Sequence, residues 1–296
     1  MSGPAGPAAP PADFRSRFDR PVFIVSTPRS GSTLLFETLG QAPGVFRPGG
    51  ESHWLIEDIE ALSPAAHGWT SNRLTAEDSA AAPVERLARA FYEDLRDRDG
   101  RPASGRVRMI EKTPKNALRV PFFDSAWPDS LFVYLYRDPR ETLASIIEAW
   151  RSGAFRTYPG LPGWTGLPWS LLLVPGWERL NGRPLEEIAA HQWAATTELL
   201  LDDLQSLGRE RVRALDYGRF LAEPQAAVER LAGSLGLGWD RPLGPRLPYS
   251  VTTLSAPRPD KWRAHEAAIG SVWPIVEAAD SRARAFLEAA APPTTS

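Results

Sequence analysis

Residues 26–33, STPRSGST, combine residue types that could bind an anion. They join the apolar run PVFIVS to a stretch in which leucines recur at helical spacing. Backbone N–H groups at a helix N-terminus attract anions, and Gly31 lets the chain approach a ligand closely. Arg29 would add a positive charge, and Ser32 and Thr33 would add hydroxyl donors. We predict an anion site at this turn; the alternative is that serine and threonine only cap the helix.

A second run, LFVYLYRDPRETLASII, places Arg137 at the carboxyl end of a predicted strand. Ligands of open α/β sheets bind at such strand ends. Asp138 is placed to cap the following helix, Pro139 to begin it and Glu141 to complete a capping box. We therefore assign Arg137 to ligand binding, and Asp138 and Glu141 to structure.

Short apolar strands alternate with amphipathic helices along the chain, which predicts a parallel sheet with helices on both faces. The predicted fold is therefore a three-layer α/β fold. We expect strands at 21–26, 106–110, 131–136 and 211–217, and helices after residue 31 and at 84–97, 141–150, 185–206 and 225–235. Segment 154–178 is rich in Pro, Gly and Trp and too apolar for a solvated linker, so we predict a folded loop over the substrate cavity.

The composition is that of an ordinary globular protein. The 296 residues carry 34 basic and 36 acidic side chains, a formal net charge of -2, and 43% are hydrophobic. This near-neutral balance argues against a partner such as duplex nucleic acid. Only three of the basic residues are lysines (Lys112, Lys115 and Lys261), so a compact ammonium is expected to matter at some of these positions.

The sequence has no cysteine, which excludes thiolate chemistry and fits a reducing cytoplasm, where we expect the protein to reside. No apolar run is long enough to cross a membrane, and the start lacks the features of a signal peptide. We predict a disordered Pro/Ala-rich tail at 1–19, a single domain at 20–290 and a second disordered tail at 291–296.

The anion turn lacks the paired glycines and the Lys-Ser/Thr of a Walker A loop. TPRSGSTLL instead resembles the phosphosulfate loop of bacterial sulfotransferases that use 3'-phosphoadenosine-5'-phosphosulfate (PAPS), with Arg29 where lysine is commoner. The second run resembles their 3'-phosphate site, with Arg137 and Ser145 as the gripping pair. The resemblance implies a P-loop NTPase-like sulfotransferase fold and PAPS as co-substrate without a metal. It also implies binding of the co-substrate by the turn residues Arg29, Ser30, Gly31, Ser32 and Thr33.

The same resemblance implies a set of catalytic residues. PGGESHWLIED matches a Glu-x-His segment of heparan-sulfate-type sulfotransferases, which makes Glu51 the general base and His53 its neighbour. IEKTPKNAL matches a Glu-Lys-Thr/Ser-Pro segment whose lysine contacts the reacting sulfate, which assigns that role to Lys112. Glu111 is either a salt-bridge partner of Lys112 or a second candidate base, and His53 is a third.

Weaker matches lie later in the chain. Lys261 and Arg263 fall where the family has a nucleotide-binding loop, which implies contact with the 3'-phosphate and makes Trp262 a candidate ring contact. Tyr217 matches a stretch that we expect to be structural. Lys115 could be either a site residue or an ordinary surface lysine.

Two alternatives to a sulfotransferase remain at this point. One is a P-loop-type kinase or phosphotransferase using ATP and Mg²⁺, for which Asp138 and Asp216 are the candidate metal ligands. The other is a non-catalytic nucleotide-binding module. If the protein is a sulfotransferase, the acceptor is a hydroxyl of a small molecule, a lipid or polyketide, or a carbohydrate. The leucine-bearing loop favours the apolar acceptors, and the resemblance makes an acyl chain bound to a carrier protein a possible partner; the sequence leaves the oligomeric state open.

Overall fold

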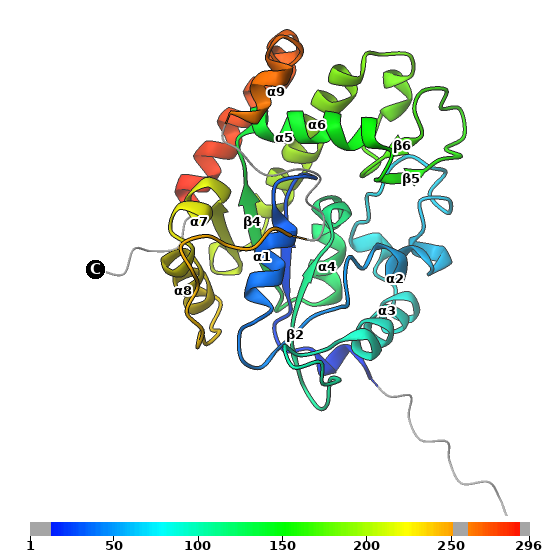
Figure 1. Cartoon of the computed structure of the whole chain (residues 1–296). Helices are drawn as coiled ribbons and strands as arrows, with labels where there is room; N and C mark the ends of the chain where they lie inside the picture. Colours follow the sequence, from blue (N-terminus) through cyan, green and yellow to red (C-terminus); the bar gives the residue numbers. More distant parts are fainter. Residues whose placement is uncertain (1–12, 251–259, 291–296) are drawn as a thin grey trace, which may run out of the picture.

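A five-stranded parallel sheet lies at the centre of the computed structural model, which describes residues 13–250 and 260–290 (Figure 1). Its strands lie in the order β2 (Val45–Phe46), β3 (Arg108–Lys112), β1 (Val22–Val25), β4 (Leu131–Tyr136) and β7 (Val212–Asp216). Every neighbouring pair is parallel, so the carboxyl ends of the strands meet at one edge. The predicted parallel α/β sheet is confirmed, and β4 has the predicted bounds.

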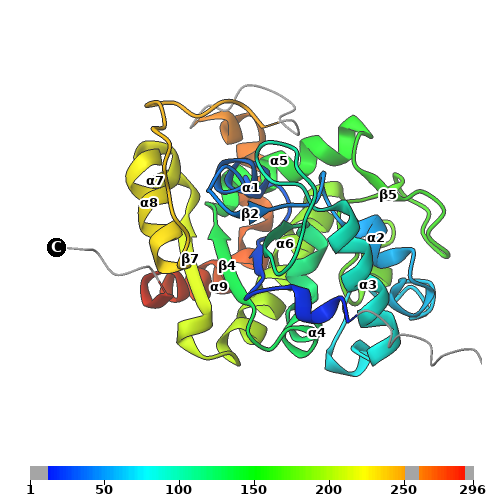
Figure 2. The same ribbon diagram turned by 90° about the horizontal axis from the view of Figure 1, so that it is seen from below.

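Alternate residues of the central strands face two different apolar cores, as the pleat of a strand requires. Phe23 and Val25 face a core covered by α2 (His53–Glu57), α3 (Ala81–Asp94), α4 (Val120–Ala126) and part of α6 (Leu185–Gln205). Val22 and Ile24 face the other core, under α1 (Ser32–Leu39), α7 (Tyr217–Ala222) and α8 (Pro224–Ser234). Figures 1 and 2 both show α7 and α8 on the opposite side of the molecule from α2 and α3. The predicted three layers are therefore present.

A third core lies beside the sheet, between α5 (Pro139–Ser152), α6 and α9 (Glu266–Ala290). Four tryptophan rings pack in it with centroid distances of 4.9 to 6.3 Å: Trp150, Trp164, Trp169 and Trp177. Three of them are buried, and Trp164 is half-buried. These side chains are therefore core residues.

The segment predicted as a folded loop, 154–178, contains a small antiparallel hairpin of β5 (Arg156–Tyr158) and β6 (Trp169–Ser170). Thr157 Oγ1 donates to the Leu171 carbonyl at 2.5 Å, and the Leu171 amide donates to the Phe155 carbonyl at 3.0 Å. This hairpin is the β5–β6 pair beside α2 in Figure 1. The segment is therefore held by its own backbone pairing as well as by its buried tryptophans.

The ordered chain begins earlier than predicted. Residues 13–19 were expected in a disordered tail, but Arg15–Arg17 form a 3-10 helix and Phe18 is buried. The ring of Phe18 packs edge-on against Tyr92 and Trp127, which explains why this part is fixed. Residues 1–12 and the predicted tail 291–296 lie outside the described residues. The other described 3-10 helices are Glu60–Leu62, Ala76–Asp78, Pro114–Leu118, Trp177–Leu180, Arg209–Arg211 and Lys261–His265.

Candidate active site

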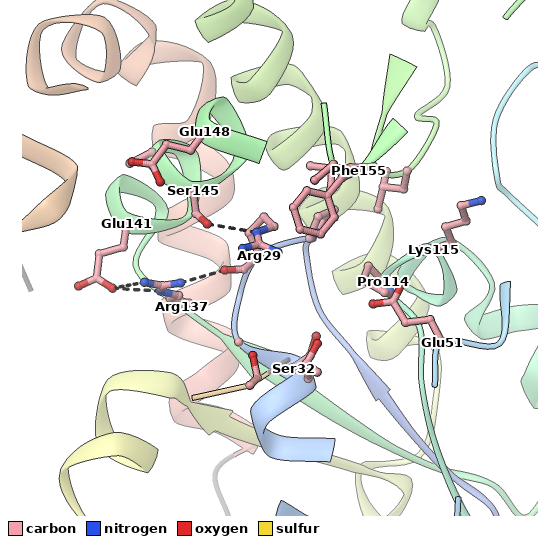
Figure 3. A pocket seen from close by; sticks show the side chains of 18 of the residues that line it. Arg29, Ser32, Glu51, Pro114, Lys115, Arg137, Glu141, Ser145, Glu148 and Phe155 are labelled. Carbon is pink, nitrogen blue, oxygen red and sulfur yellow. Dashed lines mark hydrogen bonds and ion pairs between the residues drawn. The ribbon is translucent and has the colours of Figure 1, made fainter. Parts of the chain in front are cut away.

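The carboxyl ends of β1, β3 and β4 open into a pocket of about 380 Å³ (Figure 3). Its size lies within the range of small-molecule sites. Nine of the predicted site residues line it: Arg29, Gly31, Ser32, Thr33, Glu51, His53, Arg137, Ser145 and Lys261. These residues come from distant parts of the sequence, and the sheet topology brings them together.

The turn between β1 and α1 has the geometry of an anion-binding loop. Helix α1 begins at Ser32, so the backbone N–H groups of its first turn point toward the pocket. Gly31 has φ +89°, and a Cβ added there would lie 2.2 Å from Cε2 of Tyr217, so only glycine fits. Arg29 also has a left-handed φ, +67°, which is rare for a residue other than glycine. The side chain of Ser30 does not line the pocket and shares a 2.7 Å hydrogen bond with Thr27.

Arg29 contacts three other elements. Its Nε donates to Ser145 Oγ at 3.2 Å, and its carbonyl accepts from Arg137 Nη1 at 2.9 Å. The guanidinium lies 4.5 Å from the ring centre of Phe155 (Figure 3). Burial and, second, the charge of Arg137 lower the pKa of Arg29. Two arginines and a serine are thus packed at one end of the pocket, where an anion would offset their mutual repulsion.

Arg137 is held at the end of β4 by Glu141, with Nη2 and Nε donating to Oε2 at 2.8 and 3.0 Å. This corrects the prediction that Glu141 completes a capping box, because its carboxylate turns to the arginine instead. Asp138 caps α5 as predicted and accepts from the amide of Arg140 at 2.8 Å. The ring of Tyr217 lies 4.9 Å from the Arg137 guanidinium. Arg137, which the sequence predicts at this strand end, is therefore oriented by Glu141 on one side and Tyr217 on the other.

Lys112 and Glu51 form an ion pair on the opposite side of the pocket. The ammonium donates to Glu51 Oε1 at 2.7 Å and to Thr33 Oγ1 at 2.9 Å. The side chain of Lys112 is 2% exposed, whereas that of Glu51 is 34% exposed and reaches the pocket. Three elements thus meet at one ammonium: β3, the start of α1 and the loop before α2.

His53 lies next to Glu51, with Nδ1 3.9 Å from Oε2. Its pKa is lowered, first by burial and then by the charge of Lys115, so the imidazole is neutral at pH 7. The imidazole is 41% exposed at the pocket. It can orient a ligand, but its distance from Glu51 exceeds that of a hydrogen bond.

Glu111 does not pair with Lys112, because successive residues of β3 point to opposite faces. Its carboxylate is fully buried and accepts from Ser52, Thr113 and Asn116 at 2.6 to 2.7 Å. Burial raises its pKa. This arrangement anchors Ser52, the residue after Glu51, to β3. Glu111 itself does not line the pocket.

Lys115 is not a surface lysine. It is 5% exposed, and its ammonium donates to both oxygens of Glu57 at 2.9 Å and to the hydroxyl of Tyr158 at 2.8 Å. Arg119 donates to the same carboxylate at 2.7 Å. Burial lowers the pKa of Lys115 to about 8. This Glu57 cluster (Glu57, Lys115, Arg119 and Tyr158) joins α2, the 3-10 helix after β3 and the hairpin.

Two of the three late residues assigned from the sequence reach the pocket. Lys261, paired with Glu148, and Trp262 line it. Arg263 does not: its side chain is 63% exposed, its nearest acidic partner is Glu266 at 3.8 Å, and its guanidinium lies over Trp262. Residues 251–259, which precede these positions, lie outside the described residues.

Several lining residues carry no signal in the sequence. Glu148, Phe155, Leu171 and Leu172 line the pocket, and so does Ser250. Glu148 falls one helical turn after Ser145, which places both on one face of α5. Phe155 and the leucines reach the pocket only through the fold of the hairpin, which no spacing rule predicts.

The carboxylates considered as magnesium ligands are used elsewhere. Asp138 caps α5 and Asp216 caps α7, where it accepts from the amide of Arg219 at 2.7 Å. Within 13–250 and 260–290, no three or more His, Asp or Glu side chains gather as metal ligands would. None of the helices in those ranges combines the length and hydropathy that a membrane span requires.

A parallel sheet with a glycine-containing turn between its first strand and a helix, and an arginine at the end of the neighbouring strand, has the architecture of the P-loop-like α/β class. The chain belongs to the Sulfotransferase family, whose sequence profile matches residues 21–241. The match includes Arg29 and Arg137, the Glu51–Lys112 pair and the hairpin. It ends before Lys261.

The chain is similar to nodulation protein NoeE of Sinorhizobium fredii, with 26% identity over 226 residues, 74% of this chain and 50% of the relative. It is 29% identical over 133 residues to a putative protein-tyrosine sulfotransferase of Caenorhabditis briggsae, 45% of each chain. The chain therefore spans about half the length of the curated relatives it matches. The crystal structure of a sulfotransferase from Alicyclobacillus acidocaldarius aligns with TM-score 0.50 and 18% identity, covering 91% of this chain and 96% of that one, which supports the fold.

Proposed function

We propose that this protein transfers the sulfuryl group of PAPS to an acceptor hydroxyl. The observation that carries the proposal is the contact between Lys112, Glu51 and Thr33 at the base of the anion turn. A cation, a carboxylate and a helix N-terminus are there placed around one point. Sulfuryl transfer needs these three groups: one to bind the sulfate, one to take the acceptor proton and one to stabilise developing charge.

The pocket residues fit the co-substrate by charge. Arg29, Arg137 and Lys261 supply positive charge on one side of the pocket, and Ser145 supplies a hydroxyl. Glu141 and Glu148 hold two of these cations in place. We assign Arg137 and Ser145 to the 3'-phosphate, and the turn at 29–33 to the phosphosulfate. Family membership supports PAPS over ATP as the nucleotide.

In the proposed reaction, Glu51 takes the proton of the acceptor hydroxyl as the acceptor oxygen forms its bond to sulfur. The bond between sulfur and the 5'-phosphate oxygen breaks in line, and the electron pair remains on that oxygen as negative charge. Lys112, the α1 amides and Arg29 stabilise the charge that develops around the transferred group. His53 is proposed to orient the acceptor.

Nucleotide binding tests the proposal. 3'-Phosphoadenosine 5'-phosphate (PAP) without magnesium should raise the melting temperature by several degrees at 100 times its dissociation constant. ATP, with or without magnesium, should have a much smaller effect. Stabilisation by ATP only with magnesium would instead support the phosphotransferase alternative. Location in the cytoplasm stays a prediction from the lack of cysteine.

A further inference from the structure

The pocket has two unlike halves, and Phe155 lies between them. On one side are the charged side chains around Arg29 and Arg137; on the other, Pro114 and Glu51 face Phe155 (Figure 3). Leu171 lies next to Phe155, whose carbonyl its amide contacts, whereas Leu172 is fully buried in the third core. The half that contains Glu51, the proposed base, therefore has an apolar wall of Pro114, Phe155 and Leu171, with Lys115 and His53 beside it.

Polar groups in this apolar wall are already satisfied within the protein. An ammonium has three donors, and those of Lys115 contact the two oxygens of Glu57 and the hydroxyl of Tyr158. The hydroxyl of Thr157 donates to the carbonyl of Leu171. A ligand hydroxyl that met these groups would have to displace a buried hydrogen bond, which is costly.

Two other polar side chains in this half, unlike those of Lys115 and Thr157, lie nearer to solvent. His53 is 41% exposed beside Glu51, and Arg156 is exposed on β5. The wall can thus serve one reacting hydroxyl next to Glu51 and His53. It offers few partners for the further hydroxyls of a sugar.

The wall is held in a defined place. Leu171 has φ +65°, a left-handed conformation that a leucine adopts only when its surroundings impose it. Its amide is bonded to the Phe155 carbonyl, so these two apolar residues are fixed to each other. Tyr158, three residues after Phe155, anchors the same hairpin in the Glu57 cluster.

We propose that the acceptor is an alcohol carried on an apolar skeleton, and that Phe155 and Leu171 are its specificity-determining contacts. The proposal rests on the proposed sulfuryl transfer. A hydrocarbon chain against these side chains gains the free energy of apolar burial. A saccharide there finds few partners for its further hydroxyls.

The first experiment compares 1-octanol with methyl β-D-glucopyranoside as acceptors, using radiolabelled PAPS. We expect kcat/KM for 1-octanol to be at least about 100-fold higher, the scale on which unpaired polar groups cause rejection. A preference for the glucoside would overturn the proposal. Product from neither acceptor, in a protein that PAP stabilises, would overturn it too. Failure of PAP to stabilise the protein would instead contradict the proposed function.

A variant of the wall itself makes the test specific. Leu171→Asn keeps the fold, because asparagine tolerates the left-handed backbone, and adds an amide to the apolar surface. We expect kcat/KM for 1-octanol to fall by about 10-fold or more and the preference over the glucoside to shrink, while PAP binding is unchanged. The matched control is Leu167→Asn on the same hairpin, since Leu167 is 51% exposed and does not line the pocket. Equal effects of the two variants, or an equal loss for both acceptors, would contradict the proposal.

Discussion

Lys112 is buried with its ammonium between two oxygens that come from other parts of the chain, Thr33 Oγ1 and Glu51 Oε1. An ammonium is compact, whereas a guanidinium is a planar fork that needs more room. In a chain where nearly all basic residues are arginine, this is a physical reason to keep a lysine.

Lys112→Arg should therefore impair turnover. The longer, planar head group cannot fit between Thr33 and Glu51 without moving one of them. We expect kcat to fall by about 100-fold, as for the loss of one charge-stabilising donor, while PAP still raises the melting temperature. Steady-state kinetics with labelled PAPS gives the value. Full activity of this variant would contradict the prediction that a compact ammonium matters at this position.

Glu51→Gln removes the proposed base and keeps its shape. We expect kcat to fall by about 100-fold or more, with unchanged affinity for PAP. Turnover and PAP affinity are measured on the same preparation. If turnover is unchanged, His53 becomes the candidate, because Glu111 has no surface in the pocket.

Sequence alone could assign the residues next to a recognisable turn or strand end, such as Arg29 and Arg137. Adjacency in the chain fixed their place relative to β1 and β4. The sequence could not show that the Ser30 side chain, unlike those of Ser32 and Thr33, does not line the pocket. Which hydroxyl faces the ligand depends on the dihedral angles of the turn. Nor could the sequence reveal Phe155, whose contact with Arg29 depends on how a hairpin more than a hundred residues away folds back.

At the scale of elements, the Glu57 cluster connects the pieces that surround the pocket. Glu57 lies on α2, Lys115 on the 3-10 helix after β3, Arg119 directly before α4, and Tyr158 on the hairpin. Helix α2 has only five residues, so it depends on such contacts for its position. One carboxylate thus aligns the segment that carries Glu51 with the wall that faces it.

The lowered pKa of Lys115 gives this cluster a pH signature. Between pH 8, near its pKa in the folded protein, and about pH 10, the lysine binds a proton in the unfolded chain more than in the folded one. Stability therefore rises with pH, by at most about 1.4 kcal/mol per unit from this group. Lys115→Met should remove that rise, which urea unfolding at pH 7, 8, 9 and 10 would reveal. Parallel pH profiles of the two proteins would contradict the shift.

Elements with a strong local pattern were predictable, and those set by tertiary contacts were not. The run LFVYLY gives β4 its predicted bounds, because a parallel strand buried on both faces reads as a continuous apolar run. Strand β2 has two residues, too few to leave a pattern. The third strand lies at 108–112, two residues beyond the predicted 106–110, since register follows its pairing with β1.

At the scale of the whole molecule, the C-terminal helix completes the third core. Helix α9 buries Ile269, Val272 and Val276 although Pro274 lies within it. Its Asp280 accepts from the hydroxyl of Tyr136, the residue before Arg137, at 2.7 Å. The last described helix therefore supports the strand end at which the proposed 3'-phosphate site begins.

Val276→Asp tests this dependence. It places a carboxylate where the side chain is fully buried, and we expect a loss of more than about 4 kcal/mol in the free energy of unfolding. Ala278→Asp, on the exposed face of the same helix, should change it by less than about 0.5 kcal/mol. Urea unfolding followed by circular dichroism compares the two. Similar stabilities would mean that α9 is dispensable to the fold.

The packed tryptophans beside the pocket make the hairpin an optical reporter. Trp150 lies on α5, and Trp164 and Trp169 lie in the hairpin, with ring centroids 4.9 to 6.3 Å apart. Indoles held this close in fixed orientations couple electronically and give a near-ultraviolet circular dichroism signal that vanishes when packing loosens. The acceptor wall can thus be followed spectroscopically, without a label, while an alcohol enters or leaves it.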